Sequence, residues 1–165
     1  MKIYIGSDHA GFELKNKLVA FLGEKNKYEV IDLGPHRYDK QDDYPELIAP
    51  VAQAVSSDPQ NTRGIVCGGS GQGEAIVANR FRDVRAVVFY GNGERLNSLS
   101  RSKKEEDFEI IKLSRVHNDA NILSLGAEFL DDKEAKEAVQ LWLETPFSNE
   151  ERHRRRIAKI DKIPR

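Results

Sequence analysis

The feature that most constrains the fold is the stretch 64–80, where a short apolar run leads through glycines at 68, 69, 71 and 73 into a helical pattern. We expect Ile65 and Val66 to form a buried strand, and the residues from Glu74 onward to form a helix. Glycines let successive backbone N–H groups point into one concavity, and a following helix adds its positive dipole end. The stretch therefore predicts a site for an oxyanion or a phosphate.

Two side chains of this stretch add chemistry of their own. Glu74 falls in the first helical turn, close in sequence to the hydroxyl group of Ser70. A carboxylate there would repel a phosphate, but it could act as a general base beside a developing oxyanion. It could equally be a first-turn acid that only complements the helix dipole. The stretch by itself leaves both interpretations open.

Composition limits the class of protein. The chain has 165 residues without a Pro/Gly/Ser-rich linker, so we expect one main domain. Its 26 Lys and Arg residues balance 27 Asp and Glu residues, which does not favour a nucleic-acid partner. The chain opens on an apolar strand and has no run approaching the roughly 18 apolar residues of a membrane span, so we expect a cytoplasmic protein without a membrane partner.

Cysteine and histidine usage argues against a metal centre. Cys67 is the single cysteine, which excludes an internal disulfide and a cysteine-based zinc site. Buried packing is the favoured interpretation of this thiol, although a nucleophile at a strand end is the alternative. The four histidines, at 9, 36, 117 and 153, lack ligand-type spacing, so no metal is expected.

The remaining chain alternates short apolar strands with amphipathic helices. We expect further strands at 3–5, 28–33, 85–89 and 122–125, and further helices at 12–22, 45–55 and 133–143. Uninterrupted apolar strands are typical of a parallel sheet covered on both faces. The prediction is a doubly wound, Rossmann-like α/β fold with a five-stranded parallel sheet. The long segment 91–112 carries a charge run at 101–107, which we interpret as a solvated helix or loop.

Ligands of such sheets bind at the carboxyl ends of the strands. Asp8 and His9 follow the first strand, and the glycine turn with Glu74 follows the third, so both should face one crevice. The end of the chain, from Ser148 as a candidate N-cap, predicts a basic helix at 149–160. Its positive face could be solvated, or could bind a dianion.

Five motifs, in order over about residues 1–160, resemble the ribose-5-phosphate isomerase B family, which includes galactose-6-phosphate isomerase subunits. They are Ser-Asp-His-Ala-Gly at 7–11, the acidic segment 37–45, Gly-Ser-Gly-Gln-Gly-Glu at 69–74, His-Asn-Asp-Ala-Asn at 117–121 and the basic run 152–156. The resemblance implies an aldose–ketose isomerase that acts through a cis-enediolate without metal or cofactor. The implied substrate is ribose 5-phosphate, with allose or galactose 6-phosphate as the alternative.

The resemblance also implies roles for single residues. One branch of the family uses a cysteine base at the position held here by Gly68, whereas this chain resembles the branch whose base is matched by Glu74. Ser70 and the N–H groups of Gly71 to Gly73 would hold the enediolate oxygens. Asp8 and His117 would open the sugar ring, and Asn118 would bind a sugar hydroxyl or an enediolate oxygen. The phosphate would be bound by His9, Arg152, His153 and Arg156.

The implied assembly is a homodimer or a dimer of dimers, with His9 and the basic tail of one site coming from different subunits. Residues 1–147 would form the isomerase domain, and residues 148–165 a helical tail that reaches the partner subunit. The chain departs from the family at Glu128, where an arginine usually helps to bind phosphate, and in the length of 91–112. Either departure could change the preferred substrate.

Two other functions are compatible with parts of the sequence. A dinucleotide-binding protein is disfavoured because Asp8 puts a carboxylate where the turn must be bare for pyrophosphate. The second is a non-catalytic sugar-phosphate sensor. Asp8, Glu74 and His117 argue against it, because a sensor needs no proton-transfer groups.

Overall fold

The computed structural model of the chain describes residues 1–91 and 109–163. Its elements, in chain order, are β1 (Lys2–Ser7), α1 (Phe12–Glu24), β2 (Glu29–Asp32), α2 (Tyr44–Ser57), β3 (Thr62–Gly68), α3 (Gln72–Ala78), β4 (Ala86–Phe89), α5 (Glu109–Asn118), β5 (Ile122–Gly126), α6 (Asp132–Glu144) and α7 (Glu151–Ile160). The charge run at 101–107, interpreted from the sequence as solvated, lies outside the described residues.

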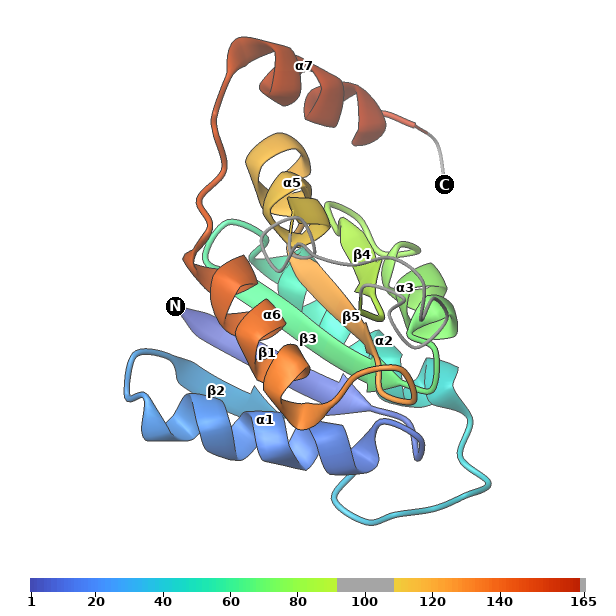
Figure 1. The fold of residues 1–165 in the computed structure, drawn as a ribbon. Coiled ribbons are helices and arrows are strands. Elements are labelled where there is room, and N and C mark those ends of the chain that lie inside the picture. The colour runs from blue at the N-terminus through green and yellow to red at the C-terminus, as the bar shows by residue number, and fades with distance from the viewer. Residues whose placement is uncertain (92–108, 164–165) are drawn as a thin grey trace, which may run out of the picture.

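The five strands form one parallel sheet in the order β2-β1-β3-β5-β4 (Figure 1). Helices α1, α5 and α6 pack on one face, and α2 and α3 on the other. The predicted doubly wound fold is confirmed. From β1 the chain passes through α1 to β2, and from β3 it passes through α3 to β4. These two connections run outward in opposite directions and lie on opposite faces of the sheet. The carboxyl ends of β1 and β3 are therefore the switch point of the sheet, and it is in the crevice at this point that such folds bind ligands.

Both faces of the sheet are buried, which explains the uninterrupted apolar strands. Along β3, Ile65 and Cys67 point into the core under α1 and α6, while Val66 points into the core under α2 and α3. All three side chains are fully buried. Burial stabilises each apolar side chain by about 1.5–3 kcal/mol relative to exposure, so the central strands provide a rigid base for the loops at their ends.

The sequence did not predict α5, and it placed the tail helix slightly too early. Ile111 of α5 is only 1% exposed and belongs to the larger core, which is why this polar helix is ordered against the sheet. The tail helix begins at Glu151 with Glu150 as its N-cap, two residues after the predicted start. Ser148 is not the N-cap: its hydroxyl accepts a hydrogen bond from the N–H of Glu150 at 3.4 Å.

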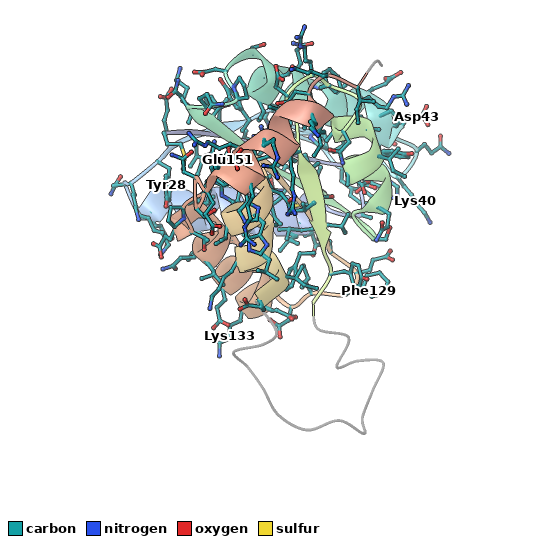
Figure 2. The ribbon with its side chains drawn as sticks, turned by 90° about the horizontal axis from the view of Figure 1, so that it is seen from above. Tyr28, Lys40, Asp43, Phe129, Lys133 and Glu151 are labelled. Carbon is teal, nitrogen blue, oxygen red and sulfur yellow. The ribbon has the colours of Figure 1, made fainter. Side chains whose placement is uncertain are left out.

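Helix α7 lies across α5, beyond the layers that cover the sheet (Figures 1 and 2). The contact includes the rings of His153 and His117, which stack with centroids 4.5 Å apart and planes inclined by 10°. His153 is buried in this contact, whereas most of the remaining residues of α7 are exposed.

Candidate active site

The glycine turn after β3 has the geometry that its sequence predicts. Gly71, the N-cap of α3, has a φ of 75°, in the left-handed region that favours glycine. The Ser124 hydroxyl donates a hydrogen bond to the carbonyl oxygen of Gly71 at 2.6 Å, and the Ser70 hydroxyl accepts one from the N–H of Gln72 at 3.3 Å. The turn is therefore fixed from β5, with Ser70 exposed at the crevice.

The carboxylate of Glu74 is held against the backbone at the end of β3. Glu74 is 4% exposed, and a Cβ atom added to Gly68 would lie 2.1 Å from its carboxyl carbon. Burial raises the pKa of Glu74, and the charges of Asp8 and Asp42 act in the same direction. A fixed carboxyl group whose pKa is shifted toward neutrality suits proton abstraction.

Asp8 reaches the same crevice from the end of β1. Its N–H donates to the carbonyl oxygen of Cys67 at 3.1 Å, and its carboxylate accepts a hydrogen bond from the N–H of Gly11 at 2.8 Å. Burial raises the pKa of Asp8 despite the opposing effect of that hydrogen bond. The charge of Asp8 also raises the pKa of Glu74, so the loop after β1 and the first turn of α3 each bring a buried carboxyl group to the same place, as the positions of the strand ends predict.

His9, next to Asp8, is paired with an acid that the sequence analysis gave no role. Its Nδ1 atom lies 2.6 Å from a carboxylate oxygen of Asp42. This hydrogen bond is the main cause of the raised pKa of His9. Asp42 comes from the segment between β2 and α2, which therefore reaches the crevice. Its only sequence signal was its presence in the acidic motif 37–45.

Cys67 adjoins these groups through its backbone, but its side chain belongs to the core. Its side chain is fully buried in the core under α1, and this burial raises the pKa of the thiol. A protonated thiol surrounded by apolar side chains is a poor nucleophile. The packing interpretation of Cys67 is confirmed.

The other predicted site residues lie at the opposite end of the strands. His117 and Asn118 end α5, just before β5 begins at Ile122. The register pairs Ile122 with Gly64 and Gly126 with Gly68, so the amino end of β5 and the Glu74 turn are one strand length apart. At about 3.3 Å per residue, this length is about 13 Å. A single chain therefore does not bring His117 together with Glu74.

Arginines fix the turn that carries His117 and Asn118. Asp119, which has a φ of 44°, accepts hydrogen bonds from Arg115 at 2.7 Å and from Arg85 at 3.2 Å. Arg85 also donates to the carbonyl oxygen of Asn118 at 2.9 Å. These charge-assisted contacts hold the backbone on both sides of Asp119, which leaves the Asn118 side chain exposed at a defined position.

The tail residues differ in how accessible they are. His153 is 4% exposed, and burial lowers its pKa, with the charges of Arg152 and His117 acting in the same direction. Arg152 is exposed and paired with Glu150 at 2.8 Å, and Arg156 is also exposed. The cationic groups that α7 offers to a ligand are therefore the arginines, while His153 packs against α5.

Glu128 stands beside the glycine turn. Its N–H donates to the carbonyl oxygen of Gly69 at 3.1 Å, and a Cβ atom added to Gly69 would lie 3.4 Å from its carboxyl carbon. The residue that departs from the family pattern thus adds a carboxylate at the mouth of the crevice. It does not supply a cation there.

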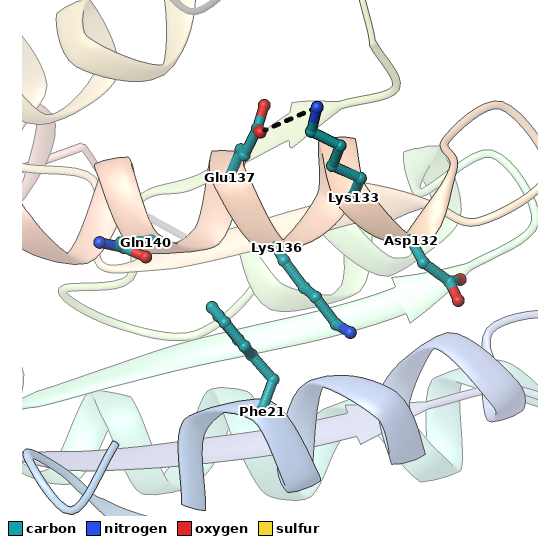
Figure 3. Close-up of a pocket in the computed structure, with 6 residues that line it drawn as sticks. All are labelled: Phe21, Asp132, Lys133, Lys136, Glu137 and Gln140. Carbon is teal, nitrogen blue, oxygen red and sulfur yellow. Dashed lines mark ion pairs between the residues drawn. The ribbon is translucent and has the colours of Figure 1, made fainter. Parts of the chain in front are cut away.

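A separate shallow groove of about 390 Å³ lies between α1 and α6 (Figure 3). Its lining residues are Phe21, Asp132, Lys133, Lys136, Glu137 and Gln140. Lys133 and Glu137 form an ion pair of 3.8 Å on α6. The described residues that line this groove come from the two helices alone, whereas Asp8, His9, Asp42 and Glu74 come from three separate parts of the chain, so the switch point remains the candidate site.

Within residues 1–91 and 109–163, no three potential ligands gather in a way that could hold a metal ion. No helix in the same ranges combines the length and apolar character needed to cross a bilayer.

The fold and the crevice define a class of protein: a doubly wound α/β protein in which acid–base groups meet a glycine turn at the switch point of the sheet. Comparison with known proteins narrows the class. Residues 3–160 match the family model described as Ribose/Galactose Isomerase, and the chain belongs to this family.

Relatives in this family match along almost the whole chain. Ribose-5-phosphate isomerase B of Mycolicibacterium paratuberculosis is 37% identical over 157 residues, which cover 95% of this chain and 87% of that protein. The crystal structure of ribose-5-phosphate isomerase B from Mycoplasma genitalium with bound ribulose-5-phosphate matches with a TM-score of 0.83 and 32% identity, covering 98% of this chain and 94% of that one. The Clostridium thermocellum enzyme matches at 38% identity with a TM-score of 0.82, covering 98% and 96%.

Proposed function

We propose that the chain is an aldose–ketose isomerase that interconverts ribose 5-phosphate and ribulose 5-phosphate, with Glu74 as the base. The observation that carries this proposal is the buried Glu74 carboxylate, held against Gly68 beside a glycine turn and within the field of Asp8. Relatives that match over nearly the whole chain carry the name ribose-5-phosphate isomerase B, which supports the five-carbon substrate.

Steric exclusion supports the glutamate base over a cysteine base. In the cysteine branch of the family, the side chain that acts as the base projects from the position held here by Gly68. In this chain the space beside Gly68 is filled by the Glu74 carboxylate, whose three terminal atoms lie 2.1–2.5 Å from where a Cβ atom would be. A side chain at 68 and the carboxylate of Glu74 therefore compete for one volume. A carboxylate base at position 74 in this conformation therefore requires glycine at position 68.

The reaction moves one proton from C2 to C1 and one hydroxyl proton from O2 to O1. Glu74 takes the proton from C2 of the open-chain aldose, and the C2–H electron pair becomes the C1–C2 double bond of the enediolate. The same carboxyl group returns the proton to C1, while the proton of the O2 hydroxyl passes to O1 and the C2=O bond forms. Ser70 and the N–H groups of Gly71 and Gly73 stabilise the negative charge on the enediolate oxygens. The raised pKa of Glu74 makes it a stronger base than an exposed carboxylate.

The remaining groups reach this site only from a second chain. Within one chain, His117 and Asn118 lie about one strand length from Glu74, at the opposite end of the strands. We therefore assign ring opening to Asp8 together with His117 of the partner subunit, in a homodimer or a dimer of dimers. Residues 1–147 are the isomerase domain in this proposal, and residues 148–165 are the tail that reaches the partner.

Phosphate binding is divided in the same way. His9 lies at the crevice, while Arg152 and Arg156 are exposed on α7. Guanidinium groups bind a dianion with paired hydrogen bonds, and His153 orders α7 by stacking on His117. Glu128 weakens the grip on phosphate from the glycine-turn side, which makes the tail arginines more important in this chain.

The first experiment is a coupled assay with ribose 5-phosphate, allose 6-phosphate and galactose 6-phosphate. We expect the highest kcat/KM with ribose 5-phosphate. Glu74→Gln should lower kcat by at least about 10²-fold, while Cys67→Ala should leave kcat nearly unchanged. Binding of ribose 5-phosphate without turnover of any of the three compounds would favour a sensor instead.

The second experiment tests the shared site by complementation. The variant Arg152→Ala/Arg156→Ala is mixed with Glu74→Gln, each nearly inactive when assayed separately. Heterodimers should regain part of the wild-type activity, because one of their two sites is intact. If mass spectrometry proves that heterodimers form and activity stays absent, each chain builds its own site.

A further inference from the structure

His9 and Asp42 form a short polar contact in the crevice, and the proposed mechanism assigns no role to Asp42. The Nδ1 atom of His9 and the Oδ1 atom of Asp42 lie 2.6 Å apart, and the two side chains are 33% and 10% exposed. We infer that Asp42 is a positioning residue, which keeps His9 protonated and directs its Nε2–H toward the phosphate of the substrate. This inference rests on the proposed function, in which His9 binds that phosphate.

Hydrogen-bond geometry supports the inference first. A carboxylate can only accept at His9 Nδ1, so Nδ1 must carry a proton, and the ring is fixed in the plane of this bond. The opposite ring atom, Nε2, then points away from Asp42. An imidazole held in this way donates from Nε2 whenever the ring is charged, which is the form that a phosphate dianion binds best.

The surrounding charges favour the charged ring. Asp8 precedes His9, Asp42 contacts it, and both acids favour the imidazolium, whereas Lys40 on the same segment as Asp42 opposes it. The ring of Tyr38 meets the His9 ring edge to face, with centroids 6.3 Å apart. The Oδ2 atom of Asp42 is buried and has no hydrogen-bond partner among the described residues. A charged His9 therefore compensates a carboxylate that is otherwise poorly solvated.

The inference predicts an effect opposite to that of simple charge removal. Deleting an acid next to an anion site normally strengthens anion binding, because a repulsion is lost. Deleting Asp42 should instead weaken phosphate binding. His9 then loses the contact that orients its ring, and it also loses its second proton at a lower pH than in the wild type. The sign of the change in KM thus separates a positioning residue from a nearby negative charge.

The experiment compares Asp42→Asn with Asp43→Asn. Asp43 is the exposed neighbour at the N-cap of α2, so the control removes the same charge one residue away. We expect the KM of Asp42→Asn for ribose 5-phosphate to lie closest to the wild-type value near pH 6, where only the orientation of His9 is lost, and to rise about tenfold relative to wild type by pH 8. The kcat should change by less than about threefold, and Asp42→Glu should restore part of the pH profile.

A second measurement on the free protein needs no turnover. NMR of protein labelled at histidine Cε1 gives the titration of His9, with His9→Asn identifying its signal. The pKa of His9 should be above the ordinary 6.5 in the wild type and in Asp43→Asn, and should fall in Asp42→Asn. An unchanged titration, or equal KM profiles for the two Asn variants, overturns the inference. Absence of turnover in the wild-type protein overturns the proposed function instead.

Discussion

Gly68→Ala should inactivate the protein while leaving it folded. The added Cβ would lie 2.1 Å from the carboxyl carbon of Glu74 and 2.2 and 2.5 Å from its oxygens. Non-bonded contacts of this kind need about 3.5 Å, so the carboxylate must move by more than 1 Å, and by about 1.4 Å at its carbon. A displacement of about 1 Å at a reacting group lowers the rate by about 10²-fold. We expect a fall of this size in kcat.

The free energy of unfolding of Gly68→Ala should change much less than its kcat. The atoms that the new methyl group meets are the far end of a flexible side chain, and the φ of Gly68 is outside the left-handed region. Alanine also has less conformational freedom than glycine in the unfolded chain, which offsets part of the steric cost. The free energy of unfolding should therefore change by no more than about 1 kcal/mol.

The assay is the coupled isomerase reaction, combined with urea unfolding of the same preparations. Gly23→Ala is the matched control, because a Cβ added to Gly23 meets no described atom within 4 Å. It should retain full activity. The reasoning is refuted if Gly68→Ala keeps wild-type kcat, or if its loss of activity follows only from unfolding.

Four further predictions concern the same crevice. Adding Gly68→Cys to Glu74→Ala should recover part of the kcat that Glu74→Ala loses, because removal of the carboxylate frees the volume that the new thiol occupies; no recovery would argue against the shared volume. The raised pKa of Glu74 means that its contribution to stability is greatest at low pH and is lost as pH rises through the folded-state pKa. Glu74→Gln should therefore raise the melting temperature at pH 7–8, with the gap closing below about pH 4.5, as calorimetry can test. Glu128→Arg should lower the KM for ribose 5-phosphate by about tenfold by replacing a repulsion with an attraction, and an unchanged KM would place the phosphate elsewhere. His117→Asn should slow turnover of a cyclic sugar phosphate much more than that of a linear one, and equal losses would exclude ring opening.

The fold was largely predictable from the sequence because its signals are local. Uninterrupted apolar strands indicate a sheet that is buried on both faces. Residues that directly follow parallel strands all lie at the carboxyl end of the sheet. This reasoning placed Asp8 and His9 beside the Glu74 turn. Helix α5 was missed because its apolar residues are interrupted by charges and because Ile111 is the one that is almost fully buried in the core. Ser114 and Arg115 of this helix are also buried but are polar, and a single buried apolar residue gives too weak a period to distinguish a helix from a loop.

The detailed contacts of the site were not predictable, for a physical reason. The pairing of His9 with Asp42 depends on the path of the segment between β2 and α2, and its partners are 33 residues apart. The Glu74 carboxylate fills the space that a Cβ atom at position 68 would need, and this depends on the rotamer of one side chain. Neither quantity leaves a periodic pattern in the chain. The motifs identified which residues matter, but not which of them touch.

The separation of His117 from Glu74 by the length of the sheet has a consequence for mass action. In the proposed assembly a folded chain holds only half of each of two sites, so folding and activity become separate equilibria. Dilution below the dissociation constant of the dimer would abolish turnover while circular dichroism still reported native helices and strands. Specific activity would then vary with protein concentration in the assay, and substrate, which bridges the two chains, would shift the subunit equilibrium toward the dimer.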